Sequence, residues 1–256
     1  MISLSEKKCL ILGGMGLIGY EISKKLLEVG AEIKIIDIKF DRIKKKKLTD
    51  KFGEKKVKFL TIKNFSEKKI NELSKDFSIL INCIYQKDIN WNKLDIEKIT
   101  KKNLINSSTK IIINSLWYPL VFANSLKRNK QKGNIINLGS IYGLVGQDNN
   151  IYKNTKLKEN IVYNYNKSGL VNFTKAMASK FTSCGIRTNL VCPGGVRDKK
   201  NKLQNNSFLK NYSERCPIGR LATPDEIANV LLFLASDGSS YMSGSIIVVD
   251  GGWLSI

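Results

Sequence analysis

The stretch Leu10-Ile11-Leu12-Gly13-Gly14-Met15-Gly16-Leu17-Ile18-Gly19 decides the fold of this chain. An apolar strand runs through glycines into a helix, which favours a dinucleotide-binding turn over an ordinary glycine-rich turn. Gly13 permits the tight turn, Gly16 lets a pyrophosphate approach the backbone, and Gly19 allows close packing of the helix on the strand. The helix expected from Ile18, directly after Leu17, supplies unpaired N–H donors for the phosphates.

An acidic residue, Asp37, ends the next apolar run and lies 18 residues beyond Gly19. A carboxylate at this position accepts hydrogen bonds from adenosine ribose hydroxyls and repels a 2′-phosphate. Like charges ~4 Å apart near a protein surface cost about 4 kcal/mol, which is enough to set a preference. We therefore expect NAD over NADP, although Lys39 and Arg42 would partly offset the repulsion. The alternative is an aspartate that only caps the loop.

Short apolar runs alternate with helical patterns along the whole chain, which predicts a parallel sheet covered on both faces. The expected strands are Cys9–Leu12, Glu32–Ile36, Val57–Ile62, Ile79–Asn82, Asn134–Leu138, Arg187–Cys192 and Ile246–Val249. The expected helices are Ile18–Val29, Phe65–Lys75, Lys110–Asn129, Tyr163–Phe181 and Pro224–Ala235. We predict one doubly wound α/β domain of the Rossmann type over residues 1–256, with about seven parallel strands. Two long loops are expected, 141–162 and the polar segment 197–213, which we interpret as a mobile substrate lid.

The composition excludes several functions. The chain has 256 residues and no histidine, which excludes Ser-His-Asp and Cys-His mechanisms and any histidine-ligated metal. We expect no metal site. The five cysteines form no CxxC pair, which favours reduced thiols and a cytoplasmic location. No apolar stretch reaches the ~18 residues of a membrane span.

The net charge of +21 is unusual, and it raises the question of a polyanionic partner. The lysines are spread over several amphipathic segments, which favours a compositional origin over a nucleic-acid interface. The runs Lys44-Lys45-Lys46-Lys47 and Lys55-Lys56 nevertheless motivate one alternative, a non-catalytic nucleic-acid-binding or regulatory protein. Salt-sensitive binding of DNA or RNA without enzymatic activity would favour that alternative.

Tyr163 and Lys167 are the strongest candidates for acid/base chemistry. They are spaced i and i+4, so they share one face of a helix, and a neighbouring ammonium lowers the pKa of a phenol. Tyr20 with Lys24 and Tyr152 with Lys156 have the same spacing, so the spacing alone does not identify the catalytic pair. The surrounding sequence has to decide.

Motifs along nearly the whole chain make it resemble a short-chain dehydrogenase/reductase. Beyond the glycine turn, the chain shows the following matches: Ile79-Leu80-Ile81-Asn82, the strand Ile135-Ile136-Asn137-Leu138-Gly139-Ser140, the run Gly185-Ile186-Arg187-Thr188-Asn189, and the C-terminal stretch 217–252. The resemblance implies an NAD(P)-dependent oxidoreductase. Lys167 precedes Asn189 by 22 residues, which fits the family, whereas Lys156 precedes it by 33. This register favours Tyr163 as the catalytic tyrosine.

The resemblance also implies the role of each site residue. Ser140 would bind the substrate oxygen, Tyr163 would transfer the proton, Lys167 would lower the pKa of Tyr163 and bind the nicotinamide ribose, and Asn114 would hold a relay water. The gap of 23 residues from Ser140 to Tyr163 is longer than in most members, so we expect an inserted loop over the substrate mouth. The further cofactor-binding residues implied by the family are Asn64, Asn82, Pro193, Gly194 and Val196.

Several positions depart from the family pattern, including Gly16 and Leu17, which place the second glycine as in the extended branch of the family. Leu12 replaces a threonine before the glycine turn, Asn64 stands where an aspartate often contacts adenine, and Arg197-Asp198 replaces a threonine after the Pro193-Gly194-Gly195 run. These departures affect the cofactor contacts more than the catalytic set.

The substrate is not fixed by the fold. The runs Ile151-Tyr152-Lys153-Asn154-Thr155 and Asp250-Gly251-Gly252-Trp253 resemble family members associated with bacterial surface sugars, as in flagellin modification. We therefore expect a sugar or nucleotide sugar as the small-molecule substrate. The alternative is a 3-oxoacyl thioester or another small ketone. Family resemblance also implies a homotetramer or a homodimer.

Overall fold

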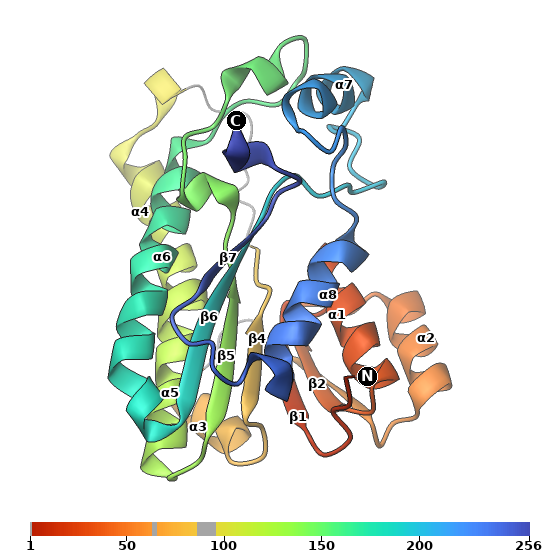
Figure 1. The fold of residues 1–256 in the computed structure, drawn as a ribbon, viewed down its shortest axis with the longest axis vertical. Coiled ribbons are helices and arrows are strands. Elements are labelled where there is room, and N and C mark those ends of the chain that lie inside the picture. The colour runs from red at the N-terminus through yellow and green to blue at the C-terminus, as the bar shows by residue number, and fades with distance from the viewer. Residues whose placement is uncertain (1, 63–65, 86–95) are drawn as a thin grey trace.

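The computed structural model describes residues 2–62, 66–85 and 96–256, and within these ranges it contains a seven-stranded parallel sheet (Figure 1). The strand order is β3-β2-β1-β4-β5-β6-β7. The strands are β1 (Lys8–Leu12), β2 (Glu32–Asp37), β3 (Val57–Thr61), β4 (Ile79–Asn82), β5 (Gly133–Leu138), β6 (Ile186–Pro193) and β7 (Ile246–Val249). Each expected apolar run forms its strand to within one residue at either end. The doubly wound α/β fold is confirmed.

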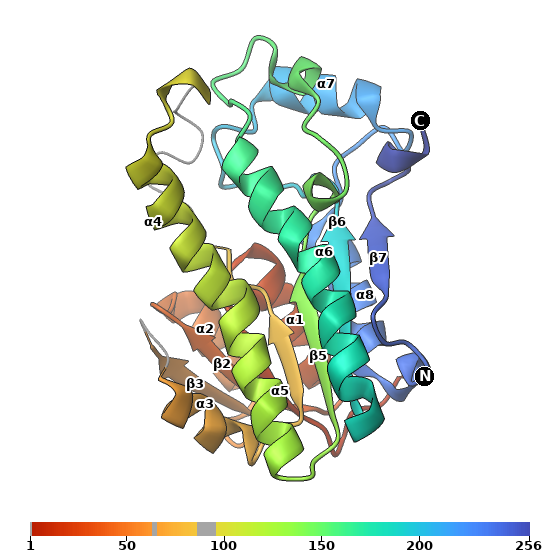
Figure 2. The same cartoon turned by 90° about the vertical axis from the view of Figure 1, so that its left-hand side faces the viewer.

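Helices cover both faces of the sheet, as the two perpendicular views in Figures 1 and 2 show. One face carries α1 (Leu17–Glu28) and α8 (Pro224–Ala235), and the other carries α3 (Glu67–Ser74), α5 (Tyr118–Arg128) and α6 (Ile161–Phe181). The structure also contains α2 (Arg42–Phe52), α4 (Lys101–Ile112) and α7 (Asn206–Arg215). Among the described residues, no helix is both long enough and apolar enough to cross a membrane.

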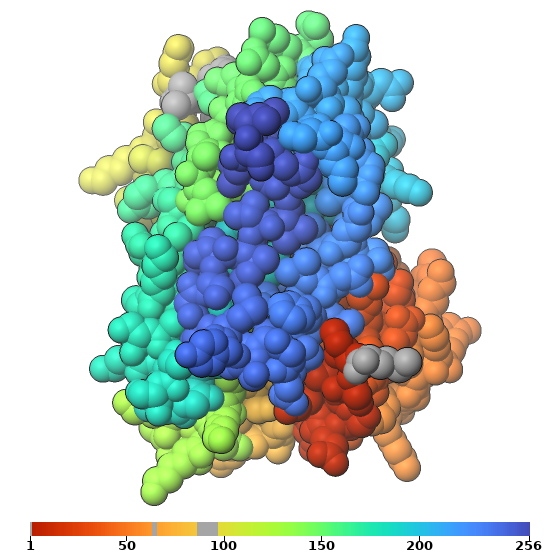
Figure 3. Space-filling view, in the orientation of Figure 1, coloured from red at the N-terminus to blue at the C-terminus, as the bar shows by residue number. Residues whose placement is uncertain are grey.

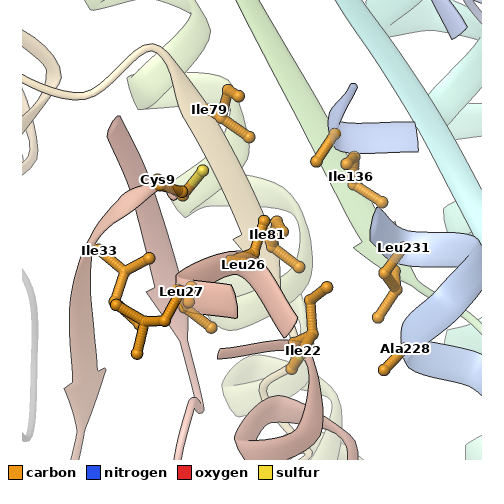
Figure 4. Close-up of a cluster of buried hydrophobic side chains, with 14 of the residues drawn as sticks. Cys9, Ile22, Leu26, Leu27, Ile33, Ile79, Ile81, Ile136, Ala228 and Leu231 are labelled. Carbon is orange, nitrogen blue, oxygen red and sulfur yellow. The ribbon is translucent and has the colours of Figure 1, made fainter. Parts of the chain in front are cut away.

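The two sides of the sheet have separate cores because successive side chains of a strand point to opposite faces. In β1, Cys9 and Ile11 join the cluster beneath α1 and α8, whereas Leu10 and Leu12 join the cluster beneath α5. Figure 4 shows the first of these clusters, in which helix side chains such as Ile22 and Leu231 approach the strands. Burial on both faces explains why the strands read as continuous apolar runs.

The strand order reverses direction between β1 and β4, and such a switch point leaves a crevice at the carboxyl ends of the strands. The turn after β1 passes close to the end of β4 at this point. A Cβ atom placed on Gly13 would meet the backbone carbonyl of Cys83 at 2.9 Å, and Gly13 has a φ of +71°. Only glycine satisfies both constraints, so the fold requires the glycine turn.

Three parts of the fold differ from the sequence-based expectation. The segment 197–213 is not an irregular loop throughout, because α7 begins inside it at Asn206. The helix α2 was not foreseen. The long central helix begins at Lys101 instead of Lys110, after a capping box formed by Thr100 and Asn103, and a π-helical turn (Ile113–Trp117) separates α4 from α5.

Candidate active site

The turn after β1 leads directly into α1. Gly16 is the N-cap residue of α1 and has no side chain, so no side-chain hydrogen bond caps the first turn at Leu17 and Ile18. A Cβ atom on Gly19 would lie 2.2 Å from the carbonyl oxygen of Gly13, so the helix packs directly on the turn. The five residues expected to bind a pyrophosphate therefore lie together at the switch point, with helix N–H groups available for an anion.

Asp37 ends β2 beside this turn. Its Oδ2 accepts a hydrogen bond from the backbone N–H of Met15 at 2.9 Å, and its Oδ1 accepts from Ile38 at 2.8 Å. From α2, the Nζ of Lys44 donates to the carbonyl oxygen of Met15 at 2.9 Å and lies 4.8 Å from the ring centroid of Tyr20. Burial lowers the pKa of Lys44. Lys44 thus helps to hold the glycine turn. The first lysine of the run 44–47 therefore has a structural role, which weakens the interpretation of this run as a nucleic-acid surface.

Ser140, Tyr163 and Lys167 come together from β5 and α6. Ser140 follows β5 as the N-cap of a short turn (Ile141–Gly143), and its side chain is hydrogen-bonded to that of Tyr163. Lys167, one helical turn beyond Tyr163, is buried and donates from Nζ to the carbonyl oxygen of Leu138 at 2.8 Å. The Nζ lies 5.6 Å from the centroid of the Tyr163 ring. The structure therefore places the expected serine, tyrosine and lysine in one cluster.

The pKa values of this cluster are set first by burial. Burial raises the pKa of Tyr163 to about 12, with Ser140 acting in the opposite direction. Burial lowers the pKa of Lys167 to about 8. The expectation that Lys167 brings the pKa of Tyr163 below its ordinary value is not met in this arrangement, because desolvation of the phenol dominates. The phenol is a protonated acid at neutral pH, and the lysine is close to its titration point.

Asn114 lies in the π-helical turn that faces the cluster. Its backbone carbonyl oxygen accepts from Nδ2 of Asn82 at 2.8 Å, and Oδ1 of Asn82 accepts from Ile84 at 3.3 Å. Short π-helical segments are frequent at functional sites. Asn82, at the end of β4, thereby fixes the turn that presents Asn114.

A crevice of about 320 Å³, including its open mouth, lies between the end of β4, α4 and α6. It is lined by Ile84, Tyr85, Ile111, Asn114, Ser115, Tyr163, Asn166 and Lys167. The ring of Tyr85 packs edge-on against Tyr163, with 6.1 Å between the ring centroids. Three of the four expected catalytic residues, Asn114, Tyr163 and Lys167, therefore line one crevice, and Ser140 reaches it through its hydrogen bond to Tyr163.

The segment after β6 is held by hydrogen bonds to β7 and within itself. Gly194 donates from its backbone N–H to the carbonyl oxygen of Val249 at 2.9 Å, directly after Pro193. The carbonyl oxygen of Val196 accepts from Nε2 of Gln204 at 2.9 Å, and Oε1 of Gln204 accepts from Arg197 at 3.2 Å. Arg197, which departs from the family pattern, is thus bound within its own segment.

Asn64, which the sequence analysis expects among the cofactor-binding residues, lies outside the described residues. Sequence reasoning gave no role to Gln147, whose Oε1 accepts from the backbone N–H of Asn160, the N-cap of α6, at 2.6 Å. Tyr152, which has the same spacing to Lys156 as the catalytic pair, is one of the residues in the Ile151–Thr155 run, and its hydroxyl accepts from Nε2 of Gln147 at 3.0 Å.

Comparisons with known proteins agree with this geometry. A family model described as enoyl-(acyl carrier protein) reductase matches residues 16–254. The 3-oxoacyl-(acyl-carrier-protein) reductase FabG of Aquifex aeolicus is 30% identical, over 98% of both chains. The chain belongs to the short-chain dehydrogenase/reductase family. It is an oxidoreductase that uses a nicotinamide dinucleotide.

Two further relatives place the chain within the short-chain dehydrogenase/reductases. The post-translational flagellin modification protein A of Campylobacter coli is 26% identical, over 98% of this chain and 99% of that protein. The crystal structure of a short-chain dehydrogenase from Leptospira borgpetersenii with bound NAD⁺ superposes with a TM-score of 0.83 at 27% identity. That match covers 98% of this chain and 94% of the Leptospira chain. The Leptospira short-chain dehydrogenase therefore has the same fold as this chain.

Proposed function

We propose that this protein is an NAD-dependent oxidoreductase that interconverts a hydroxyl and a carbonyl group on a sugar or nucleotide sugar. The observation that carries the proposal is the cluster of Ser140, Tyr163 and Lys167 beside the glycine turn. The residues present fit a dinucleotide, because side chains larger than glycine at Gly13 and Gly19 would clash with the backbone and distort the turn. Bound NAD supplies or accepts the hydride at its nicotinamide ring.

The remaining chemistry is assigned to residues of this chain. The hydroxyl of Tyr163 transfers the proton to or from the substrate oxygen, and the hydroxyl of Ser140 donates a hydrogen bond to that oxygen. Lys167 binds the nicotinamide ribose and, when protonated, stabilises the phenolate of Tyr163. Asn114 holds a water that links Lys167 to solvent. Burial keeps Tyr163 protonated at neutral pH, which suits reduction, and oxidation should become faster as the pH rises.

The preference for NAD rests on Asp37. Its carboxylate is held beside the glycine turn by the backbone of Met15, where a ribose hydroxyl can reach it. A 2′-phosphate at the same place would meet a negative charge. Lys39 and Arg42 are exposed and free to turn toward solvent, so they screen the carboxylate without neutralising it.

The sugar substrate is supported by the similarity to the flagellin modification protein A of Campylobacter coli. Tyr85 lines the crevice and packs edge-on against Tyr163, and phenol groups bind hydroxylated substrates through both ring faces and hydroxyls. A second candidate function is reduction of a 3-oxoacyl thioester. It is favoured by the higher identity to the Aquifex aeolicus reductase.

We also propose that residues 1–256 form a single domain and that the protein is a homodimer or homotetramer in the cytoplasm. Exposed apolar side chains on α4, among them Leu104, Ile105 and Ile112, support association between copies. The cysteines Cys9, Cys83, Cys184, Cys192 and Cys216 are all free thiols, which fits a reducing compartment.

The experiment that tests the function is a rate measurement at 340 nm with purified protein. NAD⁺ is offered with D-sorbitol, D-mannitol, D-gluconate and a UDP-hexose, and NADH and NADPH are offered with acetoacetyl-CoA. Turnover of a hydroxylated substrate with NAD⁺ at a higher kcat/KM than acetoacetyl-CoA supports the sugar assignment. The opposite order, with a preference for NADPH, selects the thioester reductase.

A further inference from the structure

The backbone that follows β6 runs beside the end of β5, where the expected catalytic serine lies. In the parallel ladder between these strands Leu138 pairs with Val191, and the backbone N–H of Gly139 donates to the carbonyl oxygen of Val191 at 2.7 Å. The segment 193–196 starts two residues beyond Val191, and Ser140 lies two residues beyond Leu138. The segment 193–196 is therefore next to Ser140 at the carboxyl edge of the sheet.

The strand order indicates which end of a dinucleotide this segment meets. Asp37, assigned to the adenosine ribose, ends β2, whereas Lys167 donates to the last residue of β5. The glycine turn after β1 lies between these two groups, because the strands follow one another as β2-β1-β4-β5-β6. A dinucleotide with its pyrophosphate on that turn extends its nicotinamide toward β5 and β6. The segment 193–196 therefore lies at the nicotinamide end.

Val196 offers an unused backbone donor in this segment. Before it, Gly194 donates to the carbonyl oxygen of Val249 at 2.9 Å, and after it Arg197 donates to that of Ala222 at 2.8 Å. Among the described residues, no hydrogen bond uses the N–H of Val196, although the residue is half-buried. Because a buried N–H normally has a partner, this donor is available to an acceptor on a bound ligand. The carboxamide oxygen of nicotinamide is an acceptor of this kind.

Tyr212 fixes the peptide that precedes this donor. The backbone N–H of Gly195 donates to the hydroxyl oxygen of Tyr212 at 2.5 Å. A Cβ atom on Gly195 would lie 2.6 Å from the Tyr212 ring, and one on Gly194 would lie 2.9 Å from its hydroxyl oxygen. The ring thus fills the space beside both glycines. Since each peptide unit is planar, holding the N–H of Gly195 restricts the directions that the next N–H, of Val196, can take.

The Tyr212 side chain is itself held by α7 and by the C-terminal residues. It is 2% exposed, and its ring stacks on that of Trp253 with the centroids 4.7 Å apart. Asn211 of α7 donates from Nδ2 to the carbonyl oxygen of Ile151 in the inserted loop at 3.3 Å. Ile151 is buried in one small core with Phe208 and Trp253. Figure 3 shows the C-terminal residues, in deep blue, lying against the segment that carries α7.

We propose that Tyr212 is a positioning residue for the nicotinamide end of the cofactor, because its hydroxyl fixes the peptide of Gly195 and thereby aims the free N–H of Val196. Tyr212 acts through the backbone and needs no contact with the cofactor or the substrate. The inference rests on the cofactor site expected from the sequence. It goes beyond the proposed function, since it concerns the end that NADH and NADPH share and holds for either substrate class.

The test compares two ligands in the Tyr212→Phe variant, which keeps the ring on Trp253 and removes only the hydroxyl. Binding of NADH and of ADP-ribose, which lacks the nicotinamide, is measured by isothermal titration calorimetry. We expect Kd for NADH to rise about three- to tenfold, since a hydrogen bond that orders the segment is lost. Kd for ADP-ribose should stay within about twofold, because it lacks the group that Val196 would bind.

Two results would overturn the proposal. An equal rise of both Kd values would assign Tyr212 a general structural role, and an unchanged Kd for NADH would assign its hydroxyl no role in binding. Should the wild type prefer NADPH, the same comparison is made with NADPH and 2′-phospho-ADP-ribose.

Tyr152→Phe is the matched control. Tyr152 packs against the same small core, with its ring stacked on that of Phe208 at a centroid distance of 6.4 Å. Its hydroxyl accepts from Gln147 at 3.0 Å instead of from Gly195. Removing this hydroxyl should leave both Kd values within about twofold of the wild type. The same loss of NADH affinity in both variants would place the effect in the packing of the core and contradict the role of the Gly195 hydrogen bond.

Hydrogen exchange of the ligand-free protein tests the same hydrogen bond directly. In Tyr212→Phe, one amide in the peptide that covers residues 193–197 should exchange about fivefold faster than in the wild type. Peptides from β1 and β4 should exchange at the wild-type rate, which shows that the variant is folded. Weaker NADH binding with unchanged exchange in residues 193–197 would mean that the hydroxyl does not act through Gly195.

The proposed function and this inference fail in different ways. A wild-type protein that binds neither NADH nor NADPH would remove the cofactor site and both proposals with it. Binding of NADH by the wild type with unchanged Kd values in Tyr212→Phe would remove only the role of Tyr212.

Discussion

The Asp37→Asn variant should shift cofactor selectivity toward the 2′-phosphorylated dinucleotide. In the wild type, Oδ2 of Asp37 accepts from the backbone N–H of Met15 at 2.9 Å. The side-chain oxygen of asparagine can accept the same hydrogen bond, so the glycine turn stays in place while the charge is lost. Two unit charges ~4 Å apart near a protein surface repel by about 4 kcal/mol, which sets an upper limit of roughly 10³-fold on the shift. Salt and the exposed Lys39 and Arg42 screen the carboxylate, so the lower limit is about tenfold.

The assay is a fluorescence titration of wild type and Asp37→Asn with NADH and NADPH at fixed ionic strength. We expect the wild type to bind NADH more tightly, and the ratio of the two Kd values to move at least about tenfold toward NADPH in the variant. Asp50→Asn is the control, because Asp50 is exposed on α2 and its loss changes the net charge equally. A wild-type preference for NADPH, or a ratio that moves equally in both variants, would refute the reasoning.

Four further variants test the site and the fold. Tyr163→Phe should lower kcat by about 10² to 10⁴-fold without lowering Tm, since it removes the proton donor, and wild-type kcat would exclude that role. Lys167→Met should abolish turnover yet raise Tm at pH 7. Burial lowers the pKa of Lys167 to about 8, so below pH 8 the protonated lysine destabilises the folded state. This destabilisation disappears as the pH rises from 8 toward 10.5, because the folded state then holds the neutral amine. The Tm gain of Lys167→Met should therefore shrink between pH 8 and pH 10, and a gain independent of pH would contradict the assignment. The hydrogen bonds to Arg220 hold the pKa of Glu226 at about 2. The ionised Glu226 therefore stabilises the folded state fully above pH 4.5, and this stabilisation is lost as the pH falls toward 2. Glu226→Gln should lower the free energy of unfolding in urea by about 1 kcal/mol at pH 7 and by much less at pH 3. Trp253→Ala should lower the free energy of unfolding by about 3 to 5 kcal/mol in the same measurement, because the ring is 2% exposed. A loss below about 1 kcal/mol would show that the small core of Ile151, Phe208 and Trp253 is not stabilising.

Local sequence determined the sheet and the glycine turn. The strands were predictable because burial on both faces demands continuous apolar runs, as in Ile79–Asn82, and because glycines break those runs at the switch point. The choice of Ser140, Tyr163 and Lys167 as candidate catalytic residues was also possible from the sequence. The i and i+4 spacing and the distance from Lys167 to Asn189 depend only on position along the chain. The helix α8 was foreseen with its bounds, because Thr223, Pro224 and Glu226 form a local start signal.

Helices without a local pattern were not predictable. In α2 only Leu48 is buried, so no apolar period marks the helix, and its start depends on Asp41 accepting from the N–H groups of Ile43 and Lys44. The helix α7 looked like a polar loop because its two buried residues, Phe208 and Tyr212, find their partners elsewhere in the chain.

Tertiary structure alone decided the environment of the catalytic cluster. The stacking of Tyr212 on Trp253, with the centroids 4.7 Å apart, joins segments that are 41 residues apart in sequence. The hydrogen bonds of Gln147 to Asn160 and Tyr152 likewise depend on how the inserted loop folds back over α6. The pKa of Tyr163 follows burial instead of its helical neighbour, because desolvation depends on every atom packed around the phenol. Periodicity and spacing describe a chain along one dimension, whereas burial and hydrogen-bond direction arise only when distant segments meet.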